Sequence, residues 1–322
     1  MRNRLFLCSW IIAFPAMASG WGFYGHRFIN QQAVFLLPPE MLIFYKPKLH
    51  YITDHAVDPD MRRYVLKTEG AHHYIDIDLY GRYPFRELPR NWDSAVARYS
   101  TDTLQARGIV PWWIQIMLAR LTQAFRDKNE ARILRYSADI GHYIADAHVP
   151  LHACSNHNGQ ATGQQGIHGF WESRVPELLA EKEWDFVIGK AAYIQNPSAF
   201  IWQRVLESAA AADSVLAIEK KLSALFRPDQ KYAFEDRNGV VVRQYSSAYC
   251  RAYNQRLGGM IERRMRQSIF AIASFWYTAW INAGQPDLSQ LTNPIIPGEI
   301  KQEMEALSRA WQDRPDSGQE HD

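Results

Sequence analysis

The stretch HYIADAHVPLH occupies residues 142–152, and HGFWE occupies residues 168–172. The first stretch begins with a histidine that is followed four residues later by Asp146, and the second begins with a histidine and ends at the same spacing with Glu172. Residues four apart in a helix lie on one face, about one turn from each other. Together with His152, the two pairs offer imidazole nitrogens and carboxylate oxygens, the ligand types that zinc takes. The sequence therefore predicts two helical segments that face a common metal site.

Helical periodicity extends over most of the chain. It predicts helices over 111–127, 198–226 and 246–283, one over 168–184 that is broken once near Pro176, and a further one that Asn129 caps and Pro150 ends. Residues 227–245 contain a proline, Asn238-Gly239 and three consecutive valines, which fits a hairpin or an ordered loop. We expect an all-α fold: a single multi-helix domain over 21–290, with one irregular or hairpin insertion near 227–245.

The first twenty residues have the pattern of a signal peptide. Arg2 and Arg4 precede a mostly apolar run, and Ala18-Ser19-Gly20 offers small residues for cleavage. We therefore expect export to the periplasm or the medium. Residues 291–322 are polar and contain several prolines, and we expect a solvated tail. No later stretch is apolar for long enough to span a bilayer.

Charge and cysteine content limit which partners and bonds the exported chain can have. The leader removes two of the 36 basic residues and none of the 34 acidic ones, so 34 of each remain. A net charge of zero does not favour long-range capture of a polyanion, and any affinity for phosphate must be local. The leader also removes one cysteine, which leaves Cys154 and Cys250. An oxidising compartment permits a disulfide between them, and two free thiols are equally compatible with the sequence.

The histidines are concentrated in the N-terminal half. Ten of the eleven fall between residues 26 and 168, so this half is expected to build the site. Cleavage after Gly20 would expose the α-amine of Trp21, whose reference pKa near about 8 makes it a ready metal ligand, with His26 close by. Asp58 and His73 are candidates for another ion. In the same segments Asp54, Asp60 and His72 compete with them.

These residues resemble the signature of the zinc-dependent phospholipases C and S1/P1-type nucleases, a superfamily of all-helical proteins with three zinc ions. The resemblance covers about residues 21–180 by motif, and its most specific element is the spacing from His142 to His152. It implies nine metal ligands: Trp21, His26, Asp58, His73, His142, Asp146, His152, His168 and Glu172.

The resemblance also implies how the ligands divide among three zinc ions. Asp58, His73, His142 and Asp146 would bind one ion, and His152, His168 and Glu172 a second. Trp21, His26 and Asp146 would bind the third, so Asp146 would bridge two ions. Asp58 would in addition orient or deprotonate the attacking water as a catalytic residue.

A zinc-bound water with a pKa near about 7 can attack phosphorus in line at neutral pH. We therefore expect a phosphodiester hydrolase. Arg62 or Arg63 could hold a phosphate oxygen, although the nuclease branch commonly has an arginine three residues after the aspartate, where Met61 follows Asp58. Trp171, beside the ligands, is a candidate for substrate contact, although a packing role is favoured for it.

The same hydrolysis of a phosphodiester bond can act on a phospholipid or on a single-stranded nucleic acid. Glu172 in place of aspartate and the short spacing from His152 to His168 favour a phospholipase C-like enzyme, whereas Trp171 before the acid fits the nuclease pattern. An S1/P1-type nuclease is the alternative. A non-catalytic, exported zinc-binding protein is the second alternative. We expect a monomer. His148 and His157 are expected either near the metal site or at the surface.

Overall fold

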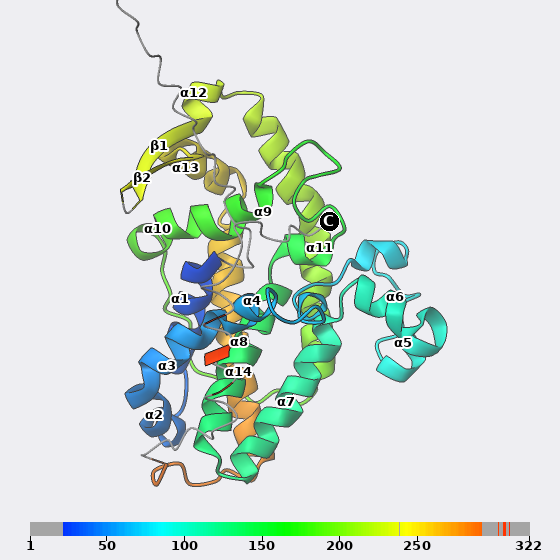
Figure 1. Ribbon diagram of the computed structural model, residues 1–322, viewed down its shortest axis with the longest axis vertical. Helices are drawn as coiled ribbons and strands as arrows, with labels where there is room; N and C mark the ends of the chain where they lie inside the picture. Colours follow the sequence, from blue (N-terminus) through cyan, green and yellow to red (C-terminus); the bar gives the residue numbers. More distant parts are fainter. Residues whose placement is uncertain (1–21, 238, 292–301, 303–304, 307–308, 310–322) are drawn as a thin grey trace, which may run out of the picture.

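The computed structural model describes residues 22–237, 239–291, 302, 305–306 and 309. Within these residues the chain is mostly helical, as the periodicity predicts, with one two-stranded sheet (Figure 1). The signal-peptide prediction, Trp21 and most of the predicted tail lie outside the described residues. No described helix is both long and apolar enough to cross a membrane.

The first half of the chain contains short helices and then two long ones. They are α1 (Gly22–Val34), α2 (Pro39–Tyr45), α3 (Leu49–Asp54), α4 (Asp58–Arg62), α5 (Trp92–Tyr99), α6 (Thr101–Ala106), α7 (Val110–Arg126) and α8 (Glu130–Ala147). Single 3-10 turns lie between them: η1 (Lys46–Lys48), η2 (His55–Val57), η3 (Gly70–His72) and η4 (Ile77–Tyr80).

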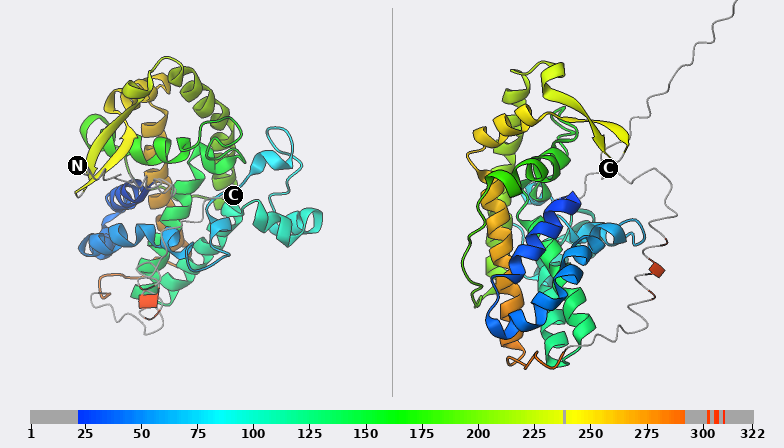
Figure 2. Two further views of the ribbon diagram at one scale, coloured as in Figure 1. Left: turned by 45° about the horizontal axis from the view of Figure 1, so that its top comes forward. Right: turned by 90° about the vertical axis from the view of Figure 1, so that its left-hand side faces the viewer.

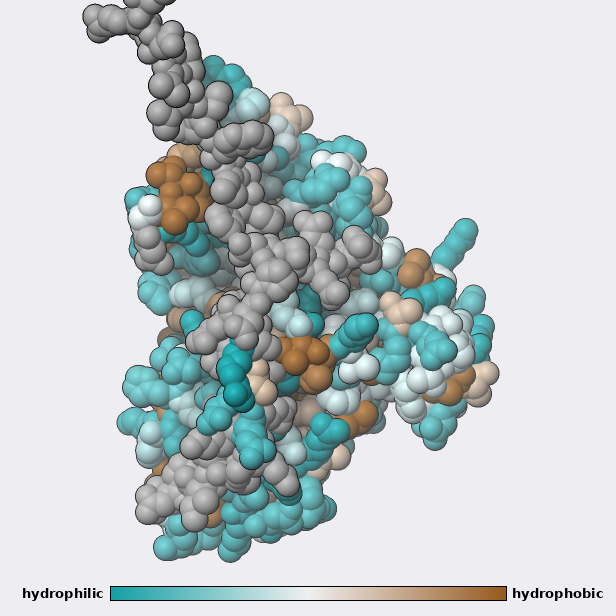
Figure 3. All heavy atoms as spheres, in the orientation of Figure 1, coloured by the Kyte–Doolittle hydropathy of each residue, from teal (hydrophilic) through white to brown (hydrophobic). Residues whose placement is uncertain are grey.

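The second half contains a segmented helix and three long ones. After η5 (Pro150–Ala153) come α9 (Ile167–Gly169), the π-helix η6 (Phe170–Arg174), α10 (Val175–Glu183), α11 (Pro197–Ser223), α12 (Pro228–Lys231), α13 (Ser247–Arg256) and α14 (Met260–Asn282). Strands β1 (Tyr232–Arg237) and β2 (Val240–Tyr245) pair antiparallel, so the predicted insertion contains a hairpin. Exposed Phe234, Val240 and Val241 belong to it, and Figure 3 shows an apolar group at its position.

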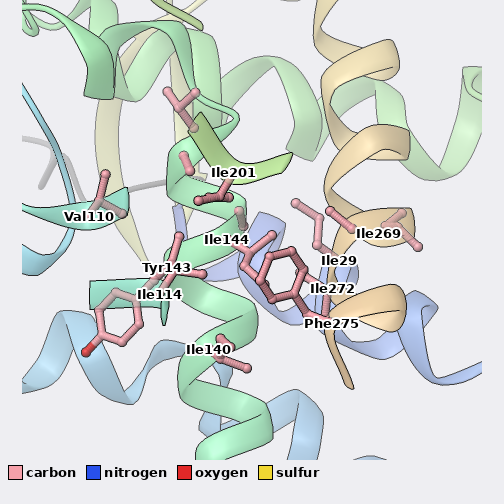
Figure 4. Close-up of a cluster of buried hydrophobic side chains, with 14 of the residues drawn as sticks. Ile29, Val110, Ile114, Ile140, Tyr143, Ile144, Ile201, Ile269, Ile272 and Phe275 are labelled. Atoms are coloured by element: carbon pink, nitrogen blue, oxygen red, sulfur yellow. The ribbon is translucent and has the colours of Figure 1, made fainter. Parts of the chain in front are cut away.

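Helix α8 lies at the centre of the molecule. It contacts α1, α3, α7, α11 and α14, and Figure 2 shows α14 beside α1 and α8. The side chain of Asn129 accepts the backbone N–H of Arg132, which confirms the predicted cap. Ile140 and Ile144 pack between Ile114 of α7 and Phe275 of α14 (Figure 4). Because neighbours cover α8 on several sides, its polar residues are buried as well as its apolar stripe.

Two helix predictions differ from the structure for identifiable backbone reasons. The helix expected over 246–283 is divided into α13 and α14, because Gly258 and Gly259 both have positive φ, which interrupts a right-handed helix. The segment 168–184 is not broken at Pro176. It widens into η6 just before that proline, whose missing N–H leaves the carbonyl of residue 172 without its ordinary helical partner.

Candidate metal centre

Eight buried ligand-type side chains converge from separate parts of the chain, near α1, α4, α8 and α9 in Figure 1. His26 comes from α1, Asp60 from α4, His73 from the residue after η3, His142 and Asp146 from α8, His152 from η5, His168 from α9 and Glu172 from η6. Each of these side chains is at most 7% exposed. They form three clusters, within each of which the ligand atoms lie within 4.8 Å of one another.

Asp146 lies at the middle of the constellation. Its Oδ1 is 3.3 Å from Nε2 of His26, and its Oδ2 is 3.3 Å from Nε2 of His142 and 3.0 Å from Nδ1 of His73. Two ligands of a tetrahedral zinc, each about 2.0–2.1 Å from the metal, are about 3.3 Å apart. The two carboxylate oxygens therefore face two different groups of imidazoles at separations that a zinc ion requires.

Asp60 completes the cluster that contains His73 and His142. Its Oδ1 is 3.8 Å from Nδ1 of His73 and 3.6 Å from Nε2 of His142. The two imidazole nitrogens are 3.1 Å apart. Both carboxylate oxygens of Asp60 are buried without a hydrogen-bond partner. A buried carboxylate without hydrogen bonds is costly, and a bound cation would remove that cost.

The third cluster depends on the segmented helix. Oε2 of Glu172 is 3.0 Å from Nε2 of His168 and 3.6 Å from Nε2 of His152. Nε2 of His152 is also 3.9 Å from Oδ1 of Asp146, so this cluster adjoins the other two. The four-residue spacing thus brings the side chains of His168 and Glu172 to the same side of the segment, although Glu172 lies in a π-helix and not in an α-helix.

Outer hydrogen bonds aim the imidazoles. Nδ1 of His142 donates to the carbonyl of Ala56 at 2.8 Å, and Nδ1 of His152 donates to the carbonyl of His73 at 2.7 Å. A carbonyl only accepts, so Nε2 of both rings is the nitrogen left for a metal. Nδ1 of His73 points toward the cluster, 3.0 Å from Oδ2 of Asp146, while its Nε2 lies 3.7 Å from Oε1 of Glu69, beyond hydrogen-bond distance. Metal-binding histidines have outer partners of this kind.

The charge states of the ligands are strongly perturbed. Burial lowers the pKa of His142, but Asp146 and Asp60 outweigh burial and raise it to about 9. Burial raises the pKa of Glu172 to about 8 and lowers that of His168 to about 4. Without a metal, the group therefore retains protons on some ligands that an ion would displace.

The structure corrects the aspartate prediction. Asp58 lies outside the three clusters, and its Oδ2 accepts from Nδ1 of His55 at 2.7 Å. Asp60, which the sequence left as a competitor, takes the place expected for Asp58. Residues two apart in a helix point about 200° apart around its axis, so α4 cannot present both carboxylates to one site. The catalytic role predicted for Asp58 stays a prediction, since the structure shows only that its carboxylate faces His55.

The substrate-contact predictions also change. Arg62 is buried and holds Asp139 at 3.0 Å and the hydroxyl of Tyr143 at 3.1 Å, so its guanidinium is engaged in the core. Its neighbour Arg63 has Nη1 3.6 Å from Oδ1 of Asp60, which belongs to one of the three clusters. Trp171 is fully buried, which places it in the core rather than on an exposed substrate surface.

The remaining candidate histidines lie outside the three clusters. His72 stacks on Trp113 and is in none of the clusters, whereas the adjacent His73 is. His148 is fully buried, with its Nδ1 donating to the carbonyl of Ile144. His157 lines a small cavity of about 70 Å³, large enough for water, together with Tyr74, Asp76, His152 and His168. This cavity gives the third cluster an opening.

The structure also shows where α1 begins and where the two cysteines lie. Gly22 has φ +41°, and a Cβ there would meet Oγ of Ser173 at 2.3 Å, so the start of α1 lies against the residue that follows Glu172. Cys154 and Cys250 are both buried and free, so they do not form a disulfide.

No model of a known protein family matches the sequence, and no curated protein matches it.

Proposed function

We propose that this chain is an exported, zinc-dependent phosphodiester hydrolase of the phospholipase C-like type. The observation that supports the proposal is that three clusters of buried ligand atoms adjoin one another through Asp146 and His142. A structural zinc site is a closed set of four protein ligands, whereas adjoining sites with few ligands each leave positions for water and substrate.

The buried donor atoms fit zinc. Nε2 of His26, His152 and His168, Oδ1 of Asp146 and both oxygens of Asp60 have no hydrogen-bond partner in the described structure. Nitrogen-rich sets suit zinc better than calcium or magnesium, which prefer oxygen. Asp60, Asp146 and Glu172 bring three negative charges, so three divalent ions would leave the centre cationic and attractive to a phosphate diester.

Bound zinc would supply a water of lowered pKa and a positive charge for the phosphoryl oxygens. The chain's own residues prepare the place for this chemistry. Asp60 lies at the junction of His73 and His142, where its carboxylate can orient the attacking water or accept its proton. Backbone carbonyls hold the imidazoles of His142 and His152 in fixed orientations, so little reorganisation is needed during the reaction.

Arg63 supports the phosphate-binding part of the proposal. Its side chain is 15% exposed and reaches Asp60, so it can contact both the centre and an incoming substrate. Guanidinium groups bind phosphate oxygens in a bidentate manner. Arg63 stands three residues after Asp60, the spacing that the nuclease branch commonly shows. This spacing favours the nuclease alternative, whereas Glu172 favours the phospholipase.

A paired assay tests the proposal. Zinc-loaded protein would be incubated with phosphatidylcholine vesicles and with single-stranded DNA, beside a His152→Ala variant that removes a ligand of the third cluster. We expect release of the phosphorylated headgroup by the wild type only. Cleavage of DNA but not lipid would replace the phospholipase with the nuclease, and stoichiometric zinc without cleavage of either would indicate the non-catalytic zinc-binding protein.

A further inference from the structure

A second cavity lies at the base of the α5–α6 unit, which projects to the side of the molecule in Figure 1. Its volume is about 560 Å³, within the range of small-molecule sites. The walls include His72, Arg90, Trp92, Trp112, Trp113 and Ile116. None of the proposed metal ligands lines it.

The tryptophan walls are held in fixed positions. Trp92 and Trp112 meet edge to face with ring centroids 5.4 Å apart, and Nε1 of Trp112 donates to the carbonyl of Arg90 at 2.8 Å. Trp113 stacks on the imidazole of His72, with ring centroids 3.7 Å apart. Rigid aromatic walls of this kind favour a flat ligand, because stacking then needs little side-chain ordering.

Arg90 gives the cavity an uncompensated positive charge. Its Nη2 donates to the carbonyls of Pro84 and Phe85, but its Nη1 is buried without a hydrogen-bond partner in the described structure. Burial lowers its pKa, and no described carboxylate contributes an opposing shift. Its guanidinium lies 4.3 Å from the ring centroid of Trp202. A partly buried cation that lacks a counter-charge is stabilised when an anion binds beside it.

We propose that this cavity is a binding site for a small anion that carries a flat aromatic ring. The ring would lie against Trp92 or Trp112, and the anionic group would pair with Nη1 of Arg90. A quaternary ammonium ligand, which aromatic cages often take, is disfavoured here because guanidinium groups already lie over Trp202 and Trp113. The proposal does not depend on the proposed hydrolysis.

Isothermal titration calorimetry on the zinc-loaded protein tests it with matched ligand pairs. Indole-3-acetate would be compared with neutral indole-3-acetamide, and adenosine monophosphate with adenosine, so that the two pairs distinguish an aromatic acid from a nucleotide. The wild type should bind at least one anion about tenfold or more tightly than its neutral partner, the gain expected from a hydrogen bond to a charged group. Choline should not bind.

Two pairs of variants assign the site. Arg90→Gln should abolish the preference for the anion, whereas Arg86→Gln, which changes an exposed arginine four residues earlier, should keep it. Ile116 is 45% exposed and lines the cavity, so Ile116→Asp should weaken anion binding through its charge while the isosteric Ile116→Asn weakens it less. This second pair leaves the hydrogen bonds of Arg90 intact and therefore guards against misfolding.

Three results would overturn the proposal. The first is that neither anion binds at millimolar concentration, and the second is that the neutral partners bind as tightly as the anions. The third is anion binding that Arg90→Gln and Ile116→Asp leave unchanged, because the anion would then occupy another site. Rates of phosphodiester hydrolysis should be the same in Arg90→Gln and wild type.

Discussion

Replacing one of two aspartates that are two residues apart should distinguish a proposed metal ligand from a partner in a partly exposed pair. Asp60→Asn removes a buried carboxylate that faces His73 and His142, whereas Asp58→Asn removes a partly exposed one that faces His55. The two substitutions are chemically identical and fall in the same short helix α4. Any difference between the variants therefore reports position.

The surroundings of the two aspartates set the expected change in zinc affinity for each variant. Structural zinc sites with four ligands bind with about 10–16 kcal/mol, or roughly 3 kcal/mol per ligand, which corresponds to about a hundredfold in affinity. Asp60→Asn should therefore weaken one zinc ion about a hundredfold and reduce hydrolysis strongly. The pair between Asp58 and His55 is 15% and 22% exposed, and pairs near the surface contribute about 0.2–1 kcal/mol. Asp58→Asn should change zinc binding less than about fivefold.

Zinc per chain would be measured by mass spectrometry after dialysis against a buffer of limiting free zinc, and hydrolysis with bis(4-nitrophenyl) phosphate. We expect Asp60→Asn to retain about one zinc ion fewer than wild type, and Asp58→Asn to match it. Circular dichroism would verify that both variants are folded. Full zinc content in Asp60→Asn together with loss in Asp58→Asn would refute the assignment and restore the aspartate that the sequence favoured.

Four further predictions rest on the same structure. Chelation should lower the melting temperature by roughly 8 °C or more if zinc is present at a thousand times its Kd, and an unchanged melting curve would argue against a buried site. At pH 7 zinc loading should release protons, because His142 with its pKa of about 9 and Glu172 with its pKa of about 8 both retain them in the metal-free protein. Calorimetry in buffers of different ionisation enthalpy measures this release, and a release of zero would contradict the prediction. In the folded protein both pKa values are higher than in the unfolded chain, so each group stabilises the fold most at low pH. This stabilisation is lost as the pH rises toward about 8 for Glu172 and about 9 for His142. The melting temperature of the chelated protein should therefore fall as the pH is raised through these values. Gly141→Ala should cost about 1–3 kcal/mol, since a Cβ there would meet the buried Asn30 at 2.2 Å, whereas Gly70→Ala, with open space, should be nearly neutral in denaturant titrations.

Local sequence patterns predicted the elements and several of the donors. The 3.6-residue period gave the long helices, Asn129 gave the start of α8, and Asn238-Gly239 gave the turn region of the hairpin. The four-residue spacing from His142 to Asp146 was sufficient to predict that both side chains share one face, because a helix fixes that relation from the backbone alone.

Contacts between distant segments decided the rest. Whether Asp58 or Asp60 faces the centre depends on the rotation of the five-residue helix α4 against its neighbours, and so short a helix has no periodic pattern that fixes its rotation. The same rotation turns Arg62 into the core and leaves Arg63 beside the centre. The choice of His73 over His72 and the division of α13 from α14 likewise depend on backbone conformation at single residues. Sequence thus determined which donors are available and which pairs share a face, while tertiary packing determined which of them meet, because burial orients side chains that local spacing leaves equivalent.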